Sequence, residues 1–126
     1  MARIEGTCRD VCNATEFVAI VTHDEDGPHV VGHWGNYMFL DIKEELIAFP
    51  VGRYQKTEQN LLKNGRIQLL VASKKVQGTK SPGQGCLITG SAEIIATGEV
   101  VDAVRVKFPW ARGALVVRVE EWRTQL

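Results

Sequence analysis

One stretch of the sequence marks the change from strand to helix: Pro50-Val51-Gly52-Arg53-Tyr54-Gln55-Lys56-Thr57. The apolar run 46–49 precedes it and predicts a buried strand that ends at Pro50. Over 54–62 the apolar side chains recur at helical spacing, so we expect a helix there. Gly65 follows Lys63 and Asn64 and predicts a left-handed cap at the end of that helix.

The beginning of this helix is a candidate anion site. A helix N-terminus offers free N–H groups and the positive end of a dipole, which suits a phosphate group. Lys56 would add a full charge and Thr57 a hydroxyl donor. From spacing alone, however, an ordinary first turn in which Arg53 and Lys56 are solvated surface charges is the favoured interpretation, because short basic motifs are common. The glycine and lysine spacing of a P-loop is absent.

The rest of the chain is divided into short apolar runs by twelve glycines and four prolines. We expect strands over 17–22, 29–40, 46–49, 67–73, 86–95 and 115–119. We also expect a first helix over 6–14 capped by Thr7, a turn over 24–28, a glycine-rich loop over 77–85, a helix over 100–108 and a tail over 122–126. This order favours a mainly β domain over 1–126, an antiparallel sheet that curls into a small closed or split barrel and so removes exposed edges.

Composition limits the function classes. The 126 residues include 15 Lys plus Arg and 15 Asp plus Glu, so the formal net charge is zero. A general nucleic-acid or anionic-membrane binder needs a positive excess, and neither partner is expected. No apolar run is long enough to cross a bilayer, and the first residues lack a secretory pattern. Three cysteines are an odd number without a dense framework, which favours a reducing cytoplasm.

Two aromatic segments are candidate ligand sites. Gly32-His33-Trp34-Gly35-Asn36-Tyr37 combines flat side chains with glycines where a strand bends, as a heteroaromatic ligand requires. Large core residues would give the same pattern. Phe108-Pro109-Trp110-Ala111-Arg112-Gly113 places a tryptophan after a proline break. Three roles are open for Trp110: to close over a ligand, to pack at a dimer contact, or to cap the end of the barrel as a hydrophobic plug.

The histidines and cysteines do not match a metal or redox motif. His23 and His29 flank the turn and are expected to face each other, whereas His29 and His33 have the even spacing of one strand face. No metal site is expected from these spacings. Cys8 and Cys12 lie four residues apart, so they are expected to share one helix face as small buried hydrophobes.

Taken together, these segments resemble the small FMN-binding proteins first known from sulfate-reducing bacteria. These proteins belong to the FMN-binding split-barrel superfamily, which is related to pyridoxamine 5′-phosphate oxidase. The resemblance runs from about Phe17 to the C-terminus. It rests on Glu25-Asp26-Gly27-Pro28-His29, Trp34 and Tyr37, Pro50-Val51-Gly52, Lys56-Thr57-Glu58, Ser73-Lys74-Lys75-Val76, Gly90-Ser91-Ala92 and Trp110-Ala111-Arg112, in that order.

The resemblance implies a six-stranded Greek-key split barrel with two or three short helices, a homodimer, and FMN at or near the dimer interface. By matching position, Lys56 and Thr57 would bind the phosphate, and Pro50, Val51 and Gly52 would line the isoalloxazine ring with backbone. The residues that would flank the ring system are Trp34, Tyr37 and Trp110. Leu126 would approach the flavin of the partner subunit.

Three positions depart from the family pattern. The family tends to have Asn where this chain has Gly32 and Thr where it has His33, and both side chains contact the cofactor region there. A family glycine is Arg53 here, which either replaces lost phosphate contacts or points to solvent. The chain also lacks the basic C-terminal substrate residues of the true pyridoxamine phosphate oxidases, so that reaction is not expected.

The leading hypothesis is a cytoplasmic, dimeric FMN-binding flavoprotein that transfers electrons or hydride, with an unidentified redox partner. A second hypothesis keeps the fold and places a deazaflavin or a heme on the same surface, with His33 as the residue to test for heme. A third is a non-catalytic dimeric interaction module, in which the aromatic residues serve only the core and the interface.

Overall fold

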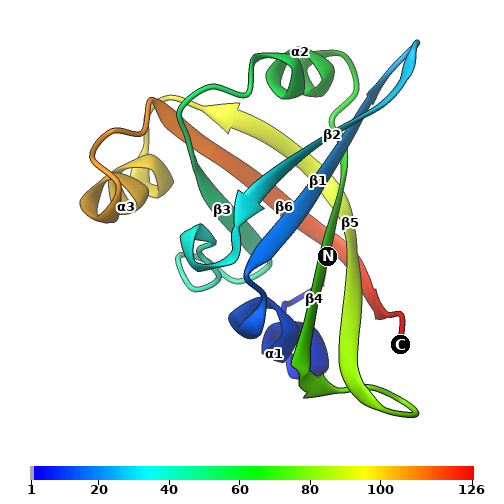
Figure 1. The fold of residues 1–126 in the computed structure, drawn as a ribbon. Helices are drawn as coiled ribbons and strands as arrows, with labels where there is room; N and C mark the ends of the chain where they lie inside the picture. Colours follow the sequence, from blue (N-terminus) through cyan, green and yellow to red (C-terminus); the bar gives the residue numbers. More distant parts are fainter. Residues whose placement is uncertain (1) are drawn as a thin grey trace.

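The computed structural model describes residues 2–126, and it forms one antiparallel sheet with helices at its ends and side (Figure 1). The sheet order is β2-β1-β4-β5-β6-β3. The strands are β1 (Phe17–Asp24), β2 (Gly27–Trp34), β3 (Leu46–Val51), β4 (Arg66–Gln77), β5 (Pro82–Ile95) and β6 (Gly113–Thr124). The helices are α1 (Gly6–Ala14), α2 (Gln55–Lys63) and α3 (Glu99–Lys107), with a 3-10 turn η1 (Gly35–Tyr37) after β2. This arrangement confirms the mainly β split-barrel prediction.

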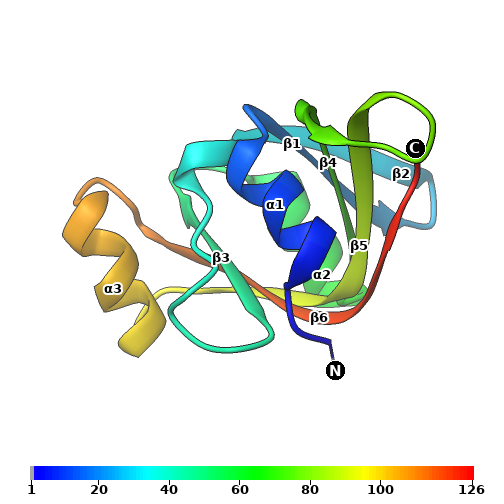
Figure 2. The ribbon, with the colours of Figure 1, turned by 90° about the horizontal axis from the view of Figure 1, so that it is seen from below.

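Alternation of apolar side chains builds the core inside the curled sheet. In β1 the inward positions are Val18 and Ile20, and in β4 they include Leu69 and Val71, all of them essentially unexposed. Helix α1 covers one open end of the barrel, as the view from below shows (Figure 2). The opposite end is covered by α2 (Figure 1). The two helices therefore close the ends that the strands leave open.

A second, smaller core lies outside the barrel, under α3. Val100, Val101 and Val104 of α3 pack against Ala48 of β3 and Val116 of β6. The helix predicted over 100–108 is thus confirmed, although valine is a poor helix former. Tertiary packing of this apolar face offsets the weak propensity.

The strand expected over 29–40 is wrong in its second half. β2 ends at Trp34, and η1 follows, because Gly35 packs directly on the chain before β1. A Cβ at position 35 would lie 1.9 Å from the carbonyl oxygen of Thr15, and the Gly35 N–H donates to Glu16 at 2.8 Å. The chain therefore bends here rather than continuing along β1.

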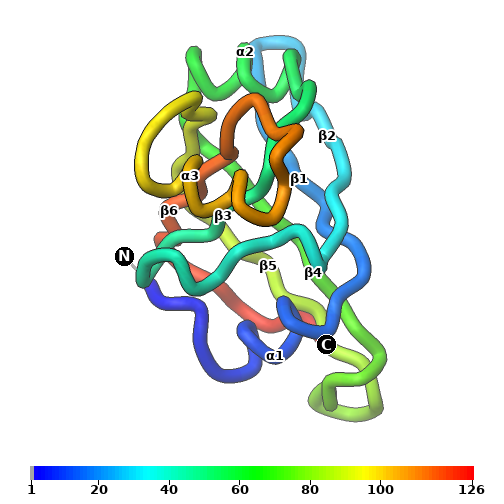
Figure 3. Tube along the Cα trace, turned by 90° about the vertical axis from the view of Figure 1, so that its left-hand side faces the viewer, coloured from blue at the N-terminus to red at the C-terminus, as the bar shows by residue number. Residues whose placement is uncertain are grey.

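Four predicted boundaries need correction. β3 continues through Pro50 to Val51, which proline allows because β3 is an edge strand. The loop over 77–85 shrinks because β5 begins at Pro82, and the β4–β5 hairpin projects from the body of the barrel (Figure 3). β6 runs on to Thr124 through the supposed tail, and β4 extends past 73 to Gln77.

The helix ends also differ from expectation. Glu5, not Thr7, is the N-cap of α1, and no side chain caps it. α2 ends at Lys63 with Asn64 as its cap, and Gly65 is not left-handed. Leu62, expected on the apolar face of α2, is 83% exposed, whereas Asn60 is buried. The buried face of α2 is therefore more polar than the periodicity predicts.

The cysteines and two of the histidines have plain structural positions. Cys8 and Cys12 are buried and unpaired, which confirms their expected role as small hydrophobes, and Cys86 is buried and unpaired as well. His23 lies opposite Pro28 and His29 opposite Thr22, so the two imidazoles do not face each other across the hairpin.

Candidate functional site

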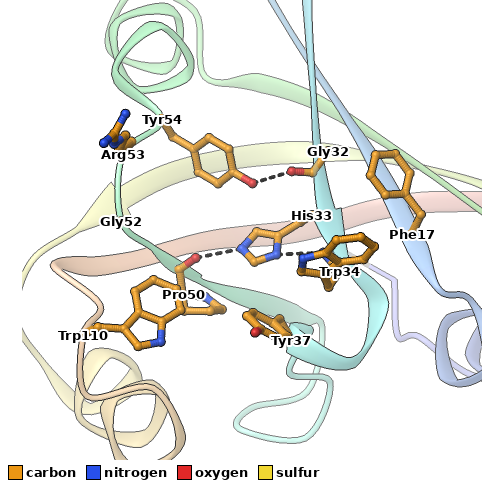
Figure 4. Close-up of a pocket in the computed structure, with 10 residues that line it drawn as sticks. All are labelled: Phe17, Gly32, His33, Trp34, Tyr37, Pro50, Gly52, Arg53, Tyr54 and Trp110. Carbon is orange, nitrogen blue, oxygen red and sulfur yellow. Dashed lines mark hydrogen bonds between the residues drawn. The ribbon is translucent and has the colours of Figure 1, made fainter.

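A pocket of about 370 Å³ lies where the two unpaired edges of the sheet, β2 and β3, approach each other (Figure 4). Aromatic rings and backbone form most of its wall. Its lining consists of Phe17, Gly32, His33, Trp34, Tyr37, Pro50, Gly52, Arg53, Tyr54 and Trp110. These residues come from the beginning of β1, from β2 and η1, from the end of β3 and the turn that joins it to α2, and from the loop after α3.

His33 joins the two edges through its imidazole. Its Nε2–H donates to the carbonyl of Pro50 at 2.8 Å, and its Nδ1 accepts the N–H of Trp34 at 2.9 Å. Burial lowers the pKa of His33, and the hydrogen bond to Pro50 opposes that shift only in part. The neutral ring also stacks on Phe49, with 5.2 Å between centroids. His33 is therefore a neutral, fixed part of the pocket wall.

Tyr54 makes a second connection between the edges. Its hydroxyl donates to the carbonyl of Gly32 at 2.5 Å, and Figure 4 shows the two groups facing each other across the top of the pocket. Tyr54 has a left-handed backbone with φ 62° and is the N-cap residue of α2. Burial raises the pKa of the Tyr54 hydroxyl, so the donor keeps its proton.

Large aromatic rings surround the pocket without being buried. Trp34 is 52% exposed and Trp110 is 55% exposed, so neither is a core residue or a buried plug. Tyr37 packs under this layer, with its ring centroid 4.4 Å from that of Phe108. Exposed indoles on a fixed scaffold can stack on a flat ligand or on another protein surface.

Phe17 belongs to the pocket, although sequence reasoning placed it only in a strand. It lies opposite Trp34 in the β1–β2 register, and the two rings meet edge to face at 6.2 Å. A Cβ built on Gly32 would lie 1.9 Å from the end of the Phe17 ring, so the ring fills the space of a side chain at position 32. No local motif carries this pairing; only a correct hairpin register around the 24–28 turn would have shown it.

The N-terminus of α2 lies beside the pocket. Within residues 2–126, the N–H groups of residues 52–57, which form the β3–α2 turn and the beginning of α2, have no hydrogen-bond partner. In that first turn Thr57 is fully buried, and its Oγ1 has no partner among the described residues. An unpaired buried hydroxyl costs about 1–3 kcal/mol, so this site is suited to an acceptor from outside the chain.

The two cations expected at this site have different surroundings. The ammonium of Lys56 forms an ion pair with Asp24 in the β1–β2 turn, and this contact raises the pKa of Lys56 and lowers that of Asp24. Arg53 is exposed at the rim of the pocket (Figure 4). Of these two cations, Arg53 therefore lines the pocket and Lys56 does not.

The structure brings most of the predicted site residues together. Gly32, His33, Trp34, Tyr37, Pro50, Gly52, Arg53 and Trp110 all line the pocket. Val51 is buried in the barrel core, and Lys56 and Thr57 lie on the adjacent α2. Leu126 lies elsewhere, beside the β4–β5 hairpin, where its carbonyl accepts hydrogen bonds from Thr79 and Gln84.

Residues 2–126 contain neither a metal-ligand cluster nor a helix that could span a membrane. No group of three or more His, Cys, Asp or Glu side chains has an arrangement that could hold a metal ion. The helices of this part of the chain are too short or too polar to cross a bilayer.

Comparison with known proteins identifies relatives over nearly the whole chain. The pyridoxamine 5′-phosphate oxidase family matches residues 4–126. A protein of Nitratidesulfovibrio vulgaris (strain DSM 19637 / Miyazaki F), named FMN-binding protein, is 40% identical over 116 residues, which cover 92% of this chain and 93% of that protein.

Solved structures share the fold at much lower sequence identity. HupZ of Group A Streptococcus superposes with a TM-score of 0.79 at 18% identity, over 97% of this chain and 99% of HupZ. An FMN-binding protein of Syntrophomonas wolfei superposes with a TM-score of 0.69 at 15% identity, over 94% of this chain and 83% of that one. An F420 reductase gives 0.62 at 17% identity, over 91% and 94% of the two chains.

Proposed function

The chain belongs to the pyridoxamine 5′-phosphate oxidase family, and we propose that it is a flavoprotein that binds FMN in the β2–β3 pocket and takes part in electron or hydride transfer. The observation that carries this proposal is the juxtaposition of exposed aromatic rings with unpartnered N–H groups and the orphaned Thr57 hydroxyl. FMN has a flat ring and a phosphate, and these two features of the pocket match its two ends. The 40% identical relative named FMN-binding protein supports the choice of this flavin.

The ring end of the pocket would hold the isoalloxazine. Trp34, Tyr37 and Trp110 supply flat apolar faces, and the backbone of Pro50 and Gly52 permits close approach. A Cβ at position 52 would lie 3.4 Å from the Trp110 indole, an ordinary van der Waals contact, so Gly52 lies close beside this ring. Phe17 adds an apolar ring where the family tends to have an amide.

The phosphate end would lie at the beginning of α2. There Thr57 Oγ1 and the unpartnered N–H groups donate to an anion, and Arg53 contributes charge from the rim. Lys56 would contribute by dividing its ammonium between Asp24 and the phosphate. Charge-assisted hydrogen bonds of this kind contribute about 1.5–3 kcal/mol each.

A bound flavin supplies one- and two-electron chemistry, and the protein sets its surroundings. His33 and Tyr54 hold the two sheet edges at a fixed separation, which gives the ring a preformed slot. The neutral state of His33 places no full positive charge beside the ring. The flanking indoles exclude water from the faces of the slot.

We further propose that a second copy of the chain completes the site. Phe17, Val30, Trp34 and Leu70 are exposed on one continuous outer face of β2, β1 and β4. An apolar face of this kind on a soluble surface is typical of a protein interface, and it adjoins the pocket. In such a dimer Leu126 would approach the flavin of the partner subunit.

The heme alternative is disfavoured by the hydrogen bonds of His33. Both ring nitrogens are occupied by backbone groups, Nε2 by Pro50 and Nδ1 by the Trp34 N–H. An axial bond to iron would have to break one of these contacts. The deazaflavin alternative shares the ring chemistry of FMN, and mass spectrometry of the released chromophore distinguishes the two.

Titration of FMN with the purified chain tests the proposal. We expect quenching of flavin fluorescence that saturates at a single FMN per chain, and a protein-bound flavin absorbance spectrum. An interaction module without a cofactor would leave the fluorescence unchanged at every protein concentration, and that result would overturn the proposal.

A further inference from the structure

Arg112 binds three successive backbone carbonyls at the rim of the pocket. Its N–H donates to Val51 at 2.9 Å, its Nε to Gly52 at 3.1 Å and its Nη2 to Arg53 at 2.6 Å. The guanidinium is a rigid planar fork, so it holds the Gly52 and Arg53 carbonyls at a fixed separation, which a flexible ammonium cannot do, whereas the Val51 carbonyl is held by the Arg112 backbone. The turn between β3 and α2 is therefore shaped from outside by one side chain.

The orientation of these carbonyls determines where the N–H groups point. In a planar trans peptide, the C=O of one residue and the N–H of the next point in opposite directions, and residues 2–126 contain no cis peptide bond. The N–H groups of Gly52, Arg53 and Tyr54 therefore point away from the Arg112 side chain. All three residues line the pocket. Successive free N–H groups next to a left-handed residue form an anion-binding concavity.

Arg112 also neutralises a charge that would oppose an anion. Glu58 lies in the first turn of α2, and its Oε1 accepts from Arg112 Nη2 at 3.0 Å. Without this partner, a free carboxylate would stand in the same helical turn as Thr57. The two effects, oriented donors and a paired carboxylate, act at the same end of the pocket.

We propose that Arg112 is a positioning residue for an anionic ligand: it holds the Gly52–Tyr54 backbone so that its N–H groups receive a phosphate. This inference rests on the proposed function, because the phosphate in question is that of FMN. Arg112 itself does not line the pocket.

The test compares FMN with riboflavin, which has the same ring and no phosphate. Wild type, Arg112→Lys and the control Arg66→Lys are titrated with each ligand. Arg66 is a matched control because it also forms an exposed ion pair, with Glu120 at 2.5 Å, and neither residue lines the pocket. We expect Arg112→Lys to weaken FMN binding about tenfold or more while riboflavin binding stays at the wild-type level. Arg66→Lys is expected to change neither.

The other outcomes overturn the inference in distinguishable ways. If Arg112→Lys weakens both ligands equally, or neither, Arg112 does not act through the phosphate, whereas the proposed function stands. If wild type binds neither ligand, the proposed function fails and the inference fails with it. If Arg112→Lys does not fold, hydrogen exchange of the wild-type protein tests the same contact. The Arg112 Nε–H should exchange with solvent more slowly than the Arg66 Nε–H. Equally fast exchange would show that the Gly52 contact does not persist.

Discussion

At the scale of single residues, His33 couples the shape of the pocket to its own charge. The neutral ring donates to Pro50 and accepts from the Trp34 N–H, so both nitrogens are satisfied without a second proton. A protonated ring would direct a second N–H at the Trp34 N–H and lose that contact. Protonation of His33 therefore works against the native pocket.

This coupling predicts a pH dependence of stability. Burial lowers the pKa of His33 below its ordinary value of 6.5. Below that value the unfolded chain binds a proton that the folded chain does not, so the free energy of unfolding falls as the pH falls from 6.5 through the folded pKa. Above 6.5 the contribution is fully present. Urea unfolding at a series of pH values should give a shallower slope in this window for His33→Gln than for wild type.

A control variant distinguishes the loss of stability caused by protonation of His33 from a loss caused by other titrating groups. His29→Gln removes an imidazole from the same strand without touching the pocket wall, and it should keep the wild-type slope. If His33→Gln and wild type lose stability in parallel below pH 6.5, the neutral, doubly bonded ring is not the cause.

Lys56 can be tested against a lysine of the same helix. Lys56 pairs with Asp24 at the first turn of α2, and Lys63 approaches Glu25 at 3.7 Å from the last turn. We expect Lys56→Ala to raise the FMN dissociation constant about tenfold, because one charge-assisted phosphate contact is lost. Lys63→Ala should have no effect on FMN titrations. Equal effects of the two variants would mean that Lys56 acts only by joining α2 to the β1–β2 turn.

Site residues that stand in a short sequence motif are predictable from the sequence, whereas those brought together only by folding are not. Trp34, Pro50 and Gly52 stand in short motifs, and each lines the pocket. Phe17 stands in none of these motifs, because only the hairpin register places it opposite Trp34 and its ring over Gly32. The unpartnered hydroxyl of Thr57 is likewise a result of packing, which no motif shows.

At the scale of elements, the close approach of β5 to β6 explains why position 90 is a glycine. Gly90 stands at an irregularity in the β5–β6 register, and a Cβ there would lie 2.0 Å from the carbonyl oxygen of Arg118. The obstacle is backbone, so it cannot rotate away. Gly90→Ala should lower the free energy of unfolding by about 1–3 kcal/mol, measured by urea denaturation.

Gly65 provides the matched control for this substitution. A Cβ at position 65 would meet its nearest neighbour at 3.7 Å, and its backbone is not left-handed. Gly65→Ala should be neutral or slightly stabilising, by up to about 1 kcal/mol. If both variants lower the free energy of unfolding equally, the close approach of β5 to β6 at Gly90 is not the cause of the loss in Gly90→Ala.

The kinds of elements were predictable, and their lengths were not. Apolar runs predict the six strands, and apolar spacing predicts α2 and α3, whereas α1 is predicted without such a spacing. β6 exceeds its predicted range because its end pairs with β5, where Thr124 lies opposite Cys86. Pairing of this kind extends a strand through polar residues, whereas a sequence shows only where the apolar residues end.

At the scale of the whole molecule, the apolar outer face predicts a dimer. Leu70 is 41% exposed on β4 and lies away from the pocket. Leu70→Lys should raise the dimer dissociation constant and produce monomers in sedimentation equilibrium, because a charge would be buried in the interface. Leu62→Lys, on the exposed side of α2, should sediment like wild type. Monomeric wild type at high concentration would contradict the dimer.

The curled sheet and its open seam explain why the pocket is preformed. The two end strands of the sheet, β2 and β3, do not pair, and hydrogen bonds of the His33 and Tyr54 side chains connect β2 with the end of β3 and the turn after it. The unpaired seam leaves room for a flat ligand, and α2 presents its N-terminus there. Topology thus brings together residues from distant parts of the chain.

Diffraction from crystals of the chain grown with FMN gives the most direct test. We predict a phosphate at the beginning of α2, within hydrogen-bond distance of Thr57 Oγ1 and the Gly52–Tyr54 N–H groups, and a ring beside Trp34 and Trp110. A flavin bound anywhere else, with the Thr57 hydroxyl still lacking a partner, would contradict the assignment of this pocket.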